Sequence, residues 1–144
     1  RGSCRTSLAF TPPASAPSGT TYYPYPPKLS EAPAAARPAV LSCIDSRTSG
    51  VYRSGSACIG LFNLLSGRHA AFVGVEVRVW DALAYLPLLA HYGFAVRYRL
   101  AAGRLSLVAS KDSDLVAELS AAVTSGGTGQ TLHGYTGTER LVIE

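Results

Sequence analysis

The sequence has 144 residues, of which 47% are hydrophobic and 15% are charged, and its formal net charge at pH 7 is +4. This length favours a single domain with one core, and the apolar share is too high for a disordered chain. No apolar run reaches the ~18 residues that a membrane-spanning helix needs, so we expect no membrane partner. The basic residues are spread along the chain instead of forming a stripe, so we expect no nucleic-acid partner.

Three cysteines, Cys4, Cys43 and Cys58, are an odd number and lack the Cys-x-x-Cys spacing of a metal or redox motif. We expect free thiols in a reducing compartment and therefore a cytoplasmic protein. No secretory signal is visible at the start of the sequence. The first residue is Arg1 and methionine is absent from the sequence, which predicts that Arg1 is not the natural beginning.

Residues 1–38 are rich in Pro, Ala and Ser, and they are predicted to form an irregular segment. Within this segment, the Tyr-Tyr-Pro-Tyr-Pro-Pro run at 22–27 has two interpretations. It is typical of a polyproline ligand for an aromatic-lined recognition domain, and it also suits a long surface loop.

Residues 39–125 are predicted to form one ordered domain. A short apolar run at 40–44 indicates a buried strand. Apolar residues at helical spacing predict a helix over 56–66, which ends at Gly67 because glycine adopts the left-handed cap without strain. The next apolar run, at 69–75, is short enough for a second strand.

The second part of this domain contains one strongly apolar helix. Residues 80–92 are apolar nearly all round, so the helix must be covered on most sides, and Pro87 is expected to bend it. A hairpin of strands at 94–100 and 104–109 follows, and then an amphipathic helix over 113–124. Strands that alternate with helices predict an α/β fold in which helices layer against a sheet.

Several common catalytic patterns are absent from the sequence, including Gly-x-Ser-x-Gly, the Walker loop and His-Glu-x-x-His. His69, His91 and His133 fit no ligand spacing, so we interpret them as structural. Residues 126–144 are predicted to form a Gly/Thr-rich tail. Its Gly-rich run at 126–130 follows a helix instead of opening one, so it lacks the geometry of a phosphate-binding loop.

One arrangement does carry chemistry. The run Arg-Ser-Gly-Ser-Ala at 53–57 opens a predicted helix, and Trp80-Asp81 opens a later one. An acidic residue in the first turn of a helix is favoured by the free backbone amides, which is a purely structural interpretation of Asp81. The same position also holds a carboxylate at the edge of an α/β sheet, where Mg²⁺ sites are built from carboxylate and phosphate oxygens.

These motifs resemble the carboxyl-terminal half of the inositol monophosphatase family, and their order and intervals agree with that family over about 40 residues. The hairpin and the final helix continue the similarity. The matching motifs are Arg-Ser-Gly-Ser-Ala at 53–57, Gly-Arg at 67–68, Ala-Ala-Phe at 70–72, Trp-Asp-Ala at 80–82, and Gly93.

The resemblance implies an inositol-phosphate phosphatase, which hydrolyses a small phosphorylated substrate with Mg²⁺ as cofactor. It implies that Asp81 is a metal ligand, and that Gly55, Ser56 and Ala57 border the hydroxyl groups of the substrate. Members of the family are often dimers, so a homodimer is also expected. The resemblance does not say which phosphate monoester is the substrate.

The sequence also departs from the family pattern. The family's amino-terminal half supplies a Glu ligand and an Asp-Pro-x-Asp-Gly-Thr motif, and neither is present here. The run at 44–48 mimics that motif, but it lies much closer to Asp81 than the family places the two. An acidic substrate contact expected before Trp-Asp falls near Val73 and Gly74, while Glu76 is out of register.

Three hypotheses follow from the motifs and the departures. The chain is the carboxyl-terminal portion of a Mg²⁺-dependent phosphate-monoester hydrolase and is incomplete as given. Alternatively, it is a non-catalytic shortened homologue that acts as a binding or assembly module. A third hypothesis is an unrelated α/β interaction domain. The sequence leaves open whether the protein is an enzyme.

Overall fold

The computed structural model of the chain describes residues 19–24, 32–125 and 131–144. Over these residues the chain forms a six-stranded mixed sheet in the order β2-β1-β3-β5-β4-β6. β1 runs parallel to both β2 and β3, while β3, β5, β4 and β6 are antiparallel neighbours. The strands are β1 (Thr20–Pro24), β2 (Val51–Tyr52), β3 (Ala71–Arg78), β4 (Ala95–Ala101), β5 (Arg104–Ser110) and β6 (His133–Gly134).

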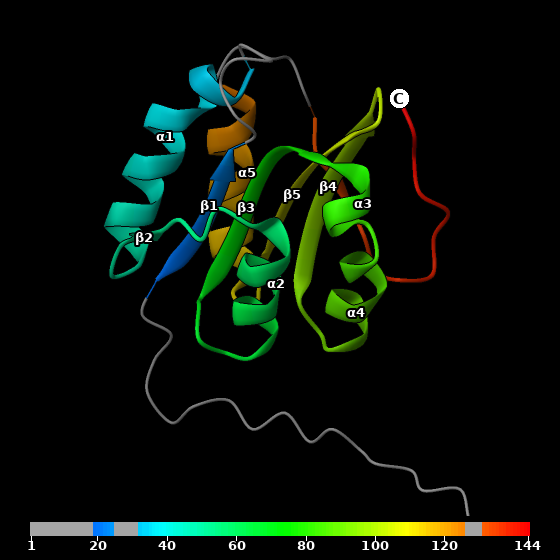
Figure 1. The fold of residues 1–144 in the computed structure, drawn as a ribbon, viewed down its shortest axis with the longest axis horizontal. Coiled ribbons are helices and arrows are strands. Elements are labelled where there is room, and N and C mark those ends of the chain that lie inside the picture. The colour runs from blue at the N-terminus through cyan, green and yellow to red at the C-terminus, as the bar shows by residue number, and fades with distance from the viewer. Residues whose placement is uncertain (1–18, 25–31, 126–130) are drawn as a thin grey trace, which may run out of the picture.

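Helices cover both faces of this sheet, as Figure 1 shows. Two longer helices, α1 (Ala32–Arg47) and α5 (Ser113–Ser125), pack on one face. Three shorter helices, α2 (Ala57–Leu65), α3 (Val79–Ala82) and α4 (Tyr85–His91), pack on the other. The molecule therefore has three layers and two hydrophobic cores, one on each side of the sheet, which confirms the predicted α/β layered fold.

Strand β3 contributes to both cores. Phe72 and Val77 pack in the core beneath α2, α3 and α4, whereas Ala71, Val73 and Val75 pack in the core beneath α1 and α5. A strand that is buried on both faces carries a nearly continuous apolar run instead of an alternating one. This explains why the sequence signal at 69–75 is a run.

A β-bulge interrupts β3 between Gly74 and Val77, where its register with β5 shifts. Glu76 lies in this bulge with a φ of 54°, in the left-handed region that favours glycine. Its backbone N–H donates to the Ser106 hydroxyl at 3.2 Å. Because of the bulge, Val77 points into the same core as Phe72, although the two residues are five positions apart.

The prediction of an irregular segment over 1–38 is wrong for residues 32–38, which belong to α1, and also for residues 20–24. Residues 20–24 form β1, which lies inside the sheet between β2 and β3. Tyr22 is buried at 1% exposure, and the Thr20 and Thr21 side chains are also buried. β-branched and aromatic residues suit a strand with partners on both sides, and this local composition outweighs the prolines that follow. The rest of the 22–27 run lies outside the described residues.

The prediction of a strand at 40–44 is also wrong, because these residues belong to α1. The buried residues of this helix are Ala36, Val40 and Ile44, which are spaced four apart and so form one face. Pro38 lies inside the helix with an exposed side chain. A proline removes one backbone hydrogen bond from a helix, yet packing of the buried face retains the helical conformation.

The single helix predicted over 80–92 is two short helices, α3 and α4, which separate near Leu83 and Ala84. Pro87 is the third residue of α4. The backbone amides of a first helical turn have no acceptor within the helix, so a proline there removes no hydrogen bond. The chain thus begins a new helix just before Pro87 instead of bending at it.

The other predicted elements are confirmed. α2 begins after Ser56, whose hydroxyl accepts the Ile59 N–H, and α5 begins after Asp112, whose carboxylate accepts two backbone N–H groups. β4 and β5 form the hairpin. Alternate residues of β4 are buried, namely Val96, Tyr98 and Leu100.

The carboxyl-terminal residues are held against β4 instead of forming a free tail over 131–144. β6 pairs with β4, and the backbone N–H of Val142 donates to the Tyr98 hydroxyl at 2.7 Å. The Glu144 carboxylate pairs with Arg99 at 2.8 Å and with His133 at 2.8 Å. The Gly-rich run at 126–130 lies outside the described residues. No described helix is both long enough and apolar enough to cross a bilayer.

The close contact between α2 and the sheet predicts the effect of a methyl group at Gly60. A Cβ added there would lie 2.5 Å from the Thr21 Cγ2 atom and 2.9 Å from the Phe72 ring. Overpacking a core costs about 1–3 kcal/mol, and the better helix propensity of alanine offsets about 1 kcal/mol of this. Gly60→Ala should therefore lower the free energy of unfolding by up to about 2 kcal/mol, measured by urea denaturation. Ile59→Ala, at an exposed neighbouring position, is the control and should change it little; a more stable Gly60→Ala protein would contradict the packing.

The bulge in β3 generates a second prediction. Glu76→Gly should raise the free energy of unfolding by about 1 kcal/mol, because only glycine adopts a positive φ without strain. Glu76→Ala is the matched control, since it removes the carboxylate but keeps the Cβ atom. If the alanine variant were stabilised as much as the glycine variant, backbone strain would not be the cause.

Candidate functional site

The first part of the candidate site is the turn that leads into α2. Gly55 has a φ of +70°, which lets the chain reverse direction before the helix. Ser56 is the N-cap, and its hydroxyl accepts the Ile59 N–H at 3.4 Å. The Ser54 hydroxyl donates to the Ser56 carbonyl at 2.7 Å, and this hydrogen bond also stabilises the turn. Ala57 is the first residue of α2 and is buried. The helix opening predicted from the sequence is therefore present.

The second part is α3, which follows β3 directly. Asp81 lies in the first turn of this helix and is half-buried. Its neighbour Trp80 is 69% exposed, and the Arg78 guanidinium lies 5.3 Å from the centre of the indole ring. The Trp-Asp pair thus opens a helix, as predicted, but the tryptophan is a surface residue instead of a core residue.

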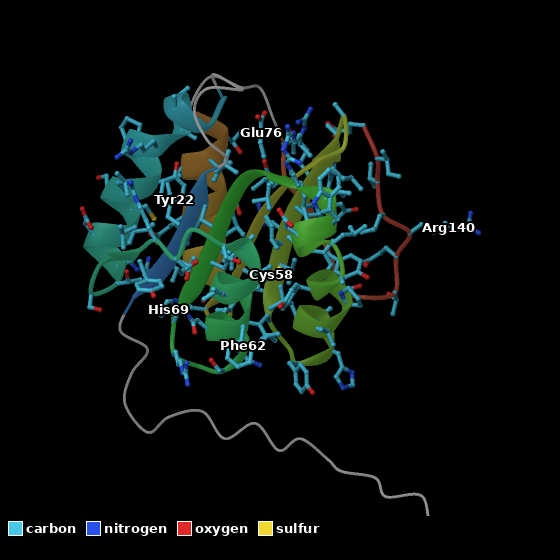
Figure 2. All side chains as sticks on the ribbon, viewed as in Figure 1. Tyr22, Cys58, Phe62, His69, Glu76 and Arg140 are labelled. Atoms are coloured by element: carbon cyan, nitrogen blue, oxygen red, sulfur yellow. The ribbon has the colours of Figure 1, made fainter. Side chains whose placement is uncertain are left out.

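Hydrogen bonds join these two parts. The Cys58 thiol, on the first turn of α2, donates to the backbone carbonyl of Asp81 at 3.2 Å. The Tyr85 hydroxyl, on α4, donates to the Cys58 carbonyl at 3.4 Å. Figure 2 labels Cys58 on α2, in the helix layer in front of the sheet. The structure therefore brings the predicted substrate residues and the predicted metal ligand to one side of the sheet.

Sequence reasoning missed the role of Cys58 and Tyr85 in this arrangement. Neither residue belongs to a motif, and their contacts join elements that are distant in the chain. Cys58 was predicted only to be a free thiol, which it is, with an exposed side chain. The spacing of the apolar residues in α2 is enough to place Cys58 on the exposed side of the helix. Nothing in the sequence identifies its hydrogen-bond partner.

The position of the expected acidic substrate contact is occupied by Gly74. A Cβ atom there would lie 2.7 Å from Val77 Cγ2 and 2.8 Å from the Phe72 ring, so the structure has no room for a carboxylate without repacking. Glu76 lies two residues later, in the bulge, near the end of β3 that leads to α3 (Figure 2). The glycine inside an apolar strand was the available sequence signal, because such a glycine often marks a bulge or a close approach.

The described residues do not form a Mg²⁺ site by themselves. Among them, no group of three or more His, Cys, Asp or Glu side chains is close enough to hold a metal ion. Asp81 is a single carboxylate, whereas protein Mg²⁺ sites combine carboxylates with phosphate oxygens and water in octahedral geometry. Asp45, from the run that mimics the family motif, lies on α1 and therefore on the opposite side of the sheet.

Two of the three histidines, His69 and His133, have partners away from this site. His69 accepts or donates a hydrogen bond with the Thr21 hydroxyl at 2.6 Å, and its ring lies 4.9 Å from that of Tyr52. Burial lowers the pKa of His69, and the nearby Arg68 lowers it further. His133 pairs with Glu144 near the carboxyl terminus. Both histidines therefore have structural partners, as the sequence predicted.

The sequence matches no protein-family model and no curated protein. Solved structures do match. Mycobacterium tuberculosis SuhB is 25% identical with a TM-score of 0.57, over 78% of this chain and 43% of that chain. An inositol monophosphatase from Anabaena is 21% identical with a TM-score of 0.53, over 76% and 47%. An IMPase from Thermotoga maritima is 17% identical with a TM-score of 0.55, over 81% and 46%.

The chain spans less than half the length of these solved structures. This share fits the predicted resemblance to the carboxyl-terminal half of the family. The matches cover 78% of this chain for SuhB and 81% for the Thermotoga maritima protein. The chain therefore has the fold of the inositol monophosphatase family, over somewhat less than half of the length of its members.

Proposed function

We propose that the chain is the carboxyl-terminal portion of a Mg²⁺-dependent phosphate-monoester hydrolase that resembles inositol monophosphatase. The observation that carries this proposal is the placement of Asp81 beside the opening of α2, through the hydrogen bond from Cys58 to the Asp81 carbonyl. The similarity in fold to SuhB and inositol monophosphatase structures supports it. The substrate is a small phosphorylated molecule.

In this proposal the chain supplies one part of a shared site. Asp81 is one of several oxygen ligands of Mg²⁺, because Mg²⁺ prefers carboxylate oxygens. Gly55, Ser56 and Ala57 border the substrate, at a helix terminus whose free amides favour oxygen-rich groups. The other carboxylates come from a segment outside this sequence. A cytoplasmic location and a homodimer remain predictions.

A second candidate function is a non-catalytic homologue that acts as a binding or assembly module. The observation that favours it is Gly74, which has no room for the expected carboxylate. Under this hypothesis the α/β scaffold is retained and Asp81 serves only to stabilise the first turn of α3. The two functions differ in whether a further segment with acidic motifs exists.

The coding sequence on both sides of these 144 residues separates the two functions. The hydrolase proposal expects an upstream segment with a Glu ligand and an Asp-Pro-x-Asp-Gly-Thr motif. The complete product should then release phosphate from small monoesters with Mg²⁺, whereas the 144-residue chain alone should not.

Asp81→Asn should lower kcat of the complete product at least about a hundredfold, because it removes a charged oxygen ligand. Asp45→Asn is the matched control: it makes the same change at an exposed position on the opposite side of the sheet and should leave kcat unchanged. Turnover by the 144-residue chain that Asp81→Asn abolishes would show that the site is complete without a further segment. Equal kcat values for Asp81→Asn and the unmodified product would rule out the role of Asp81.

A further inference from the structure

A hollow of about 400 Å³ lies between α5 and β4, and the residues just before β6 complete its wall. Figure 1 shows α5 behind the sheet and α3 in front of it, so this hollow and Asp81 lie on opposite sides of the sheet. Pockets of this volume hold small molecules in many proteins. The wall of the hollow combines one arginine with hydroxyl groups and small apolar side chains.

Arg97 supplies the positive charge of this hollow. It lies on β4 between Val96 and Tyr98, whose side chains are buried on the other side of the sheet, so Arg97 projects toward α5. The guanidinium groups of Arg47 and Arg99 both have carboxylate partners. Within the described part of the chain, the Arg97 guanidinium has neither an ion pair nor a hydrogen bond.

No carboxylate lines the hollow among the residues that the structure describes. Glu118 of α5 is already paired with an arginine of α1. Asp114, in the first turn of α5, forms no ion pair with Arg97. Residues 126–130, which follow α5 in the sequence, include no acidic residue. The chain therefore leaves the charge of Arg97 available to an external anion, which a guanidinium binds through two parallel hydrogen bonds.

The rest of the wall suits the apolar body of a ligand. Ala117, Ala121 and Leu132 supply apolar surface. The hydroxyl groups of Ser120 and Thr124 donate to backbone carbonyls within α5, at 2.5 Å and 2.8 Å. Each hydroxyl has only one proton to donate, so these two groups can only accept further hydrogen bonds and cannot hold an anion.

Arg97 lies toward one end of the hollow. It is paired with Val108 near the end of β5, and α5 begins soon after that end, so the backbone of Arg97 lies beside the first half of α5. Ser125, the last residue of α5, lines the other end. The free carbonyl groups at the carboxyl terminus of a helix repel an anion. The anionic group of a ligand is therefore favoured at Arg97, with its apolar part along α5.

We propose that this hollow binds a small organic monocarboxylate, with its carboxylate on Arg97 and its apolar body against Leu132 and the alanines of α5. The unpaired charge of Arg97 matches one negative charge, and the planar carboxylate matches the planar guanidinium. A phosphate group carries more than one negative charge at pH 7 and has no apolar surface, so it fits this wall less well. The site is independent of the proposed function, because Asp81 lies on the other side of the sheet.

Nuclear magnetic resonance of the 144-residue chain tests the proposal. The backbone amide signals of Arg97, Ala121 and Leu132 are followed while sodium hexanoate is added at constant ionic strength. We expect saturable shifts of these signals, and acetate should bind at least about tenfold more weakly because it lacks most of the apolar body. Hexylamine has the same body with the opposite charge and should cause no saturable shift. Equimolar inorganic phosphate should not displace hexanoate.

Two variants separate the charge from the shape of the hollow. Arg97→Gln should weaken hexanoate binding at least about tenfold, because it removes the charge. Ala121→Phe should weaken it as much by filling the hollow while the charge stays. Arg140→Gln is the matched control: it makes the same change as Arg97→Gln at an exposed arginine after β6, labelled in Figure 2, and should leave the affinity unchanged. Amide signals far from each substitution report whether the fold is retained.

Four results would overturn the proposal. The first is the absence of a saturable shift with hexanoate, and the second is an equal affinity of the unmodified chain and of folded Arg97→Gln or Ala121→Phe. The third is binding of hexylamine as tight as that of hexanoate, because the hollow would then recognise apolar surface without charge. The fourth is displacement of hexanoate by equimolar phosphate, because the hollow would then be a phosphate site.

Discussion

Residues of β3 pack against helices on both sides of the sheet, Phe72 toward α2 and Val73 toward α1 and α5. This double burial fixes the position of the strand, because neither face can move without opening a core. β3 leads directly into α3, so the same packing places Asp81. On the side of Phe72, α2 approaches so closely that only a glycine fits at position 60. The candidate site is therefore positioned by the core beneath it instead of by a loop.

The two sides of the sheet have opposite surface chemistry. α1 and α5 bury one face and present ion pairs to water, which is how helices behave at the outer surface of a domain. α2, α3 and α4 bury one face and still expose large apolar side chains on the other. Asp81 lies in the same layer as these exposed apolar side chains.

Local backbone features show where the chain departs from the inositol monophosphatase pattern. The family pattern expects an acidic residue near Gly74, but this glycine packs against Phe72 and Val77 with no space for a side chain. Glu76 takes up a left-handed conformation in the bulge that follows. Strain of this kind persists only where the surrounding structure fixes it. The bulge also returns the strand to register with the core, so it has a structural role independent of catalysis.

The sequence by itself determined the α/β class, α2 with its Ser56 cap, the hairpin, α5 and the motif spacing around Asp81, because these depend on short-range periodicity and capping. It did not determine β1: the β-branched and aromatic residues of 20–24 suit a strand, but their pairing with β2 and β3 on both sides appears only in the tertiary structure. It also misassigned residues 40–44, since a short apolar run suits a strand or a helix and only packing of Ala36, Val40 and Ile44 against the sheet decides between them. The contact between Cys58 and Asp81 was decided by tertiary structure alone, because it joins α2 directly to α3, and β3 separates these two helices in the sequence.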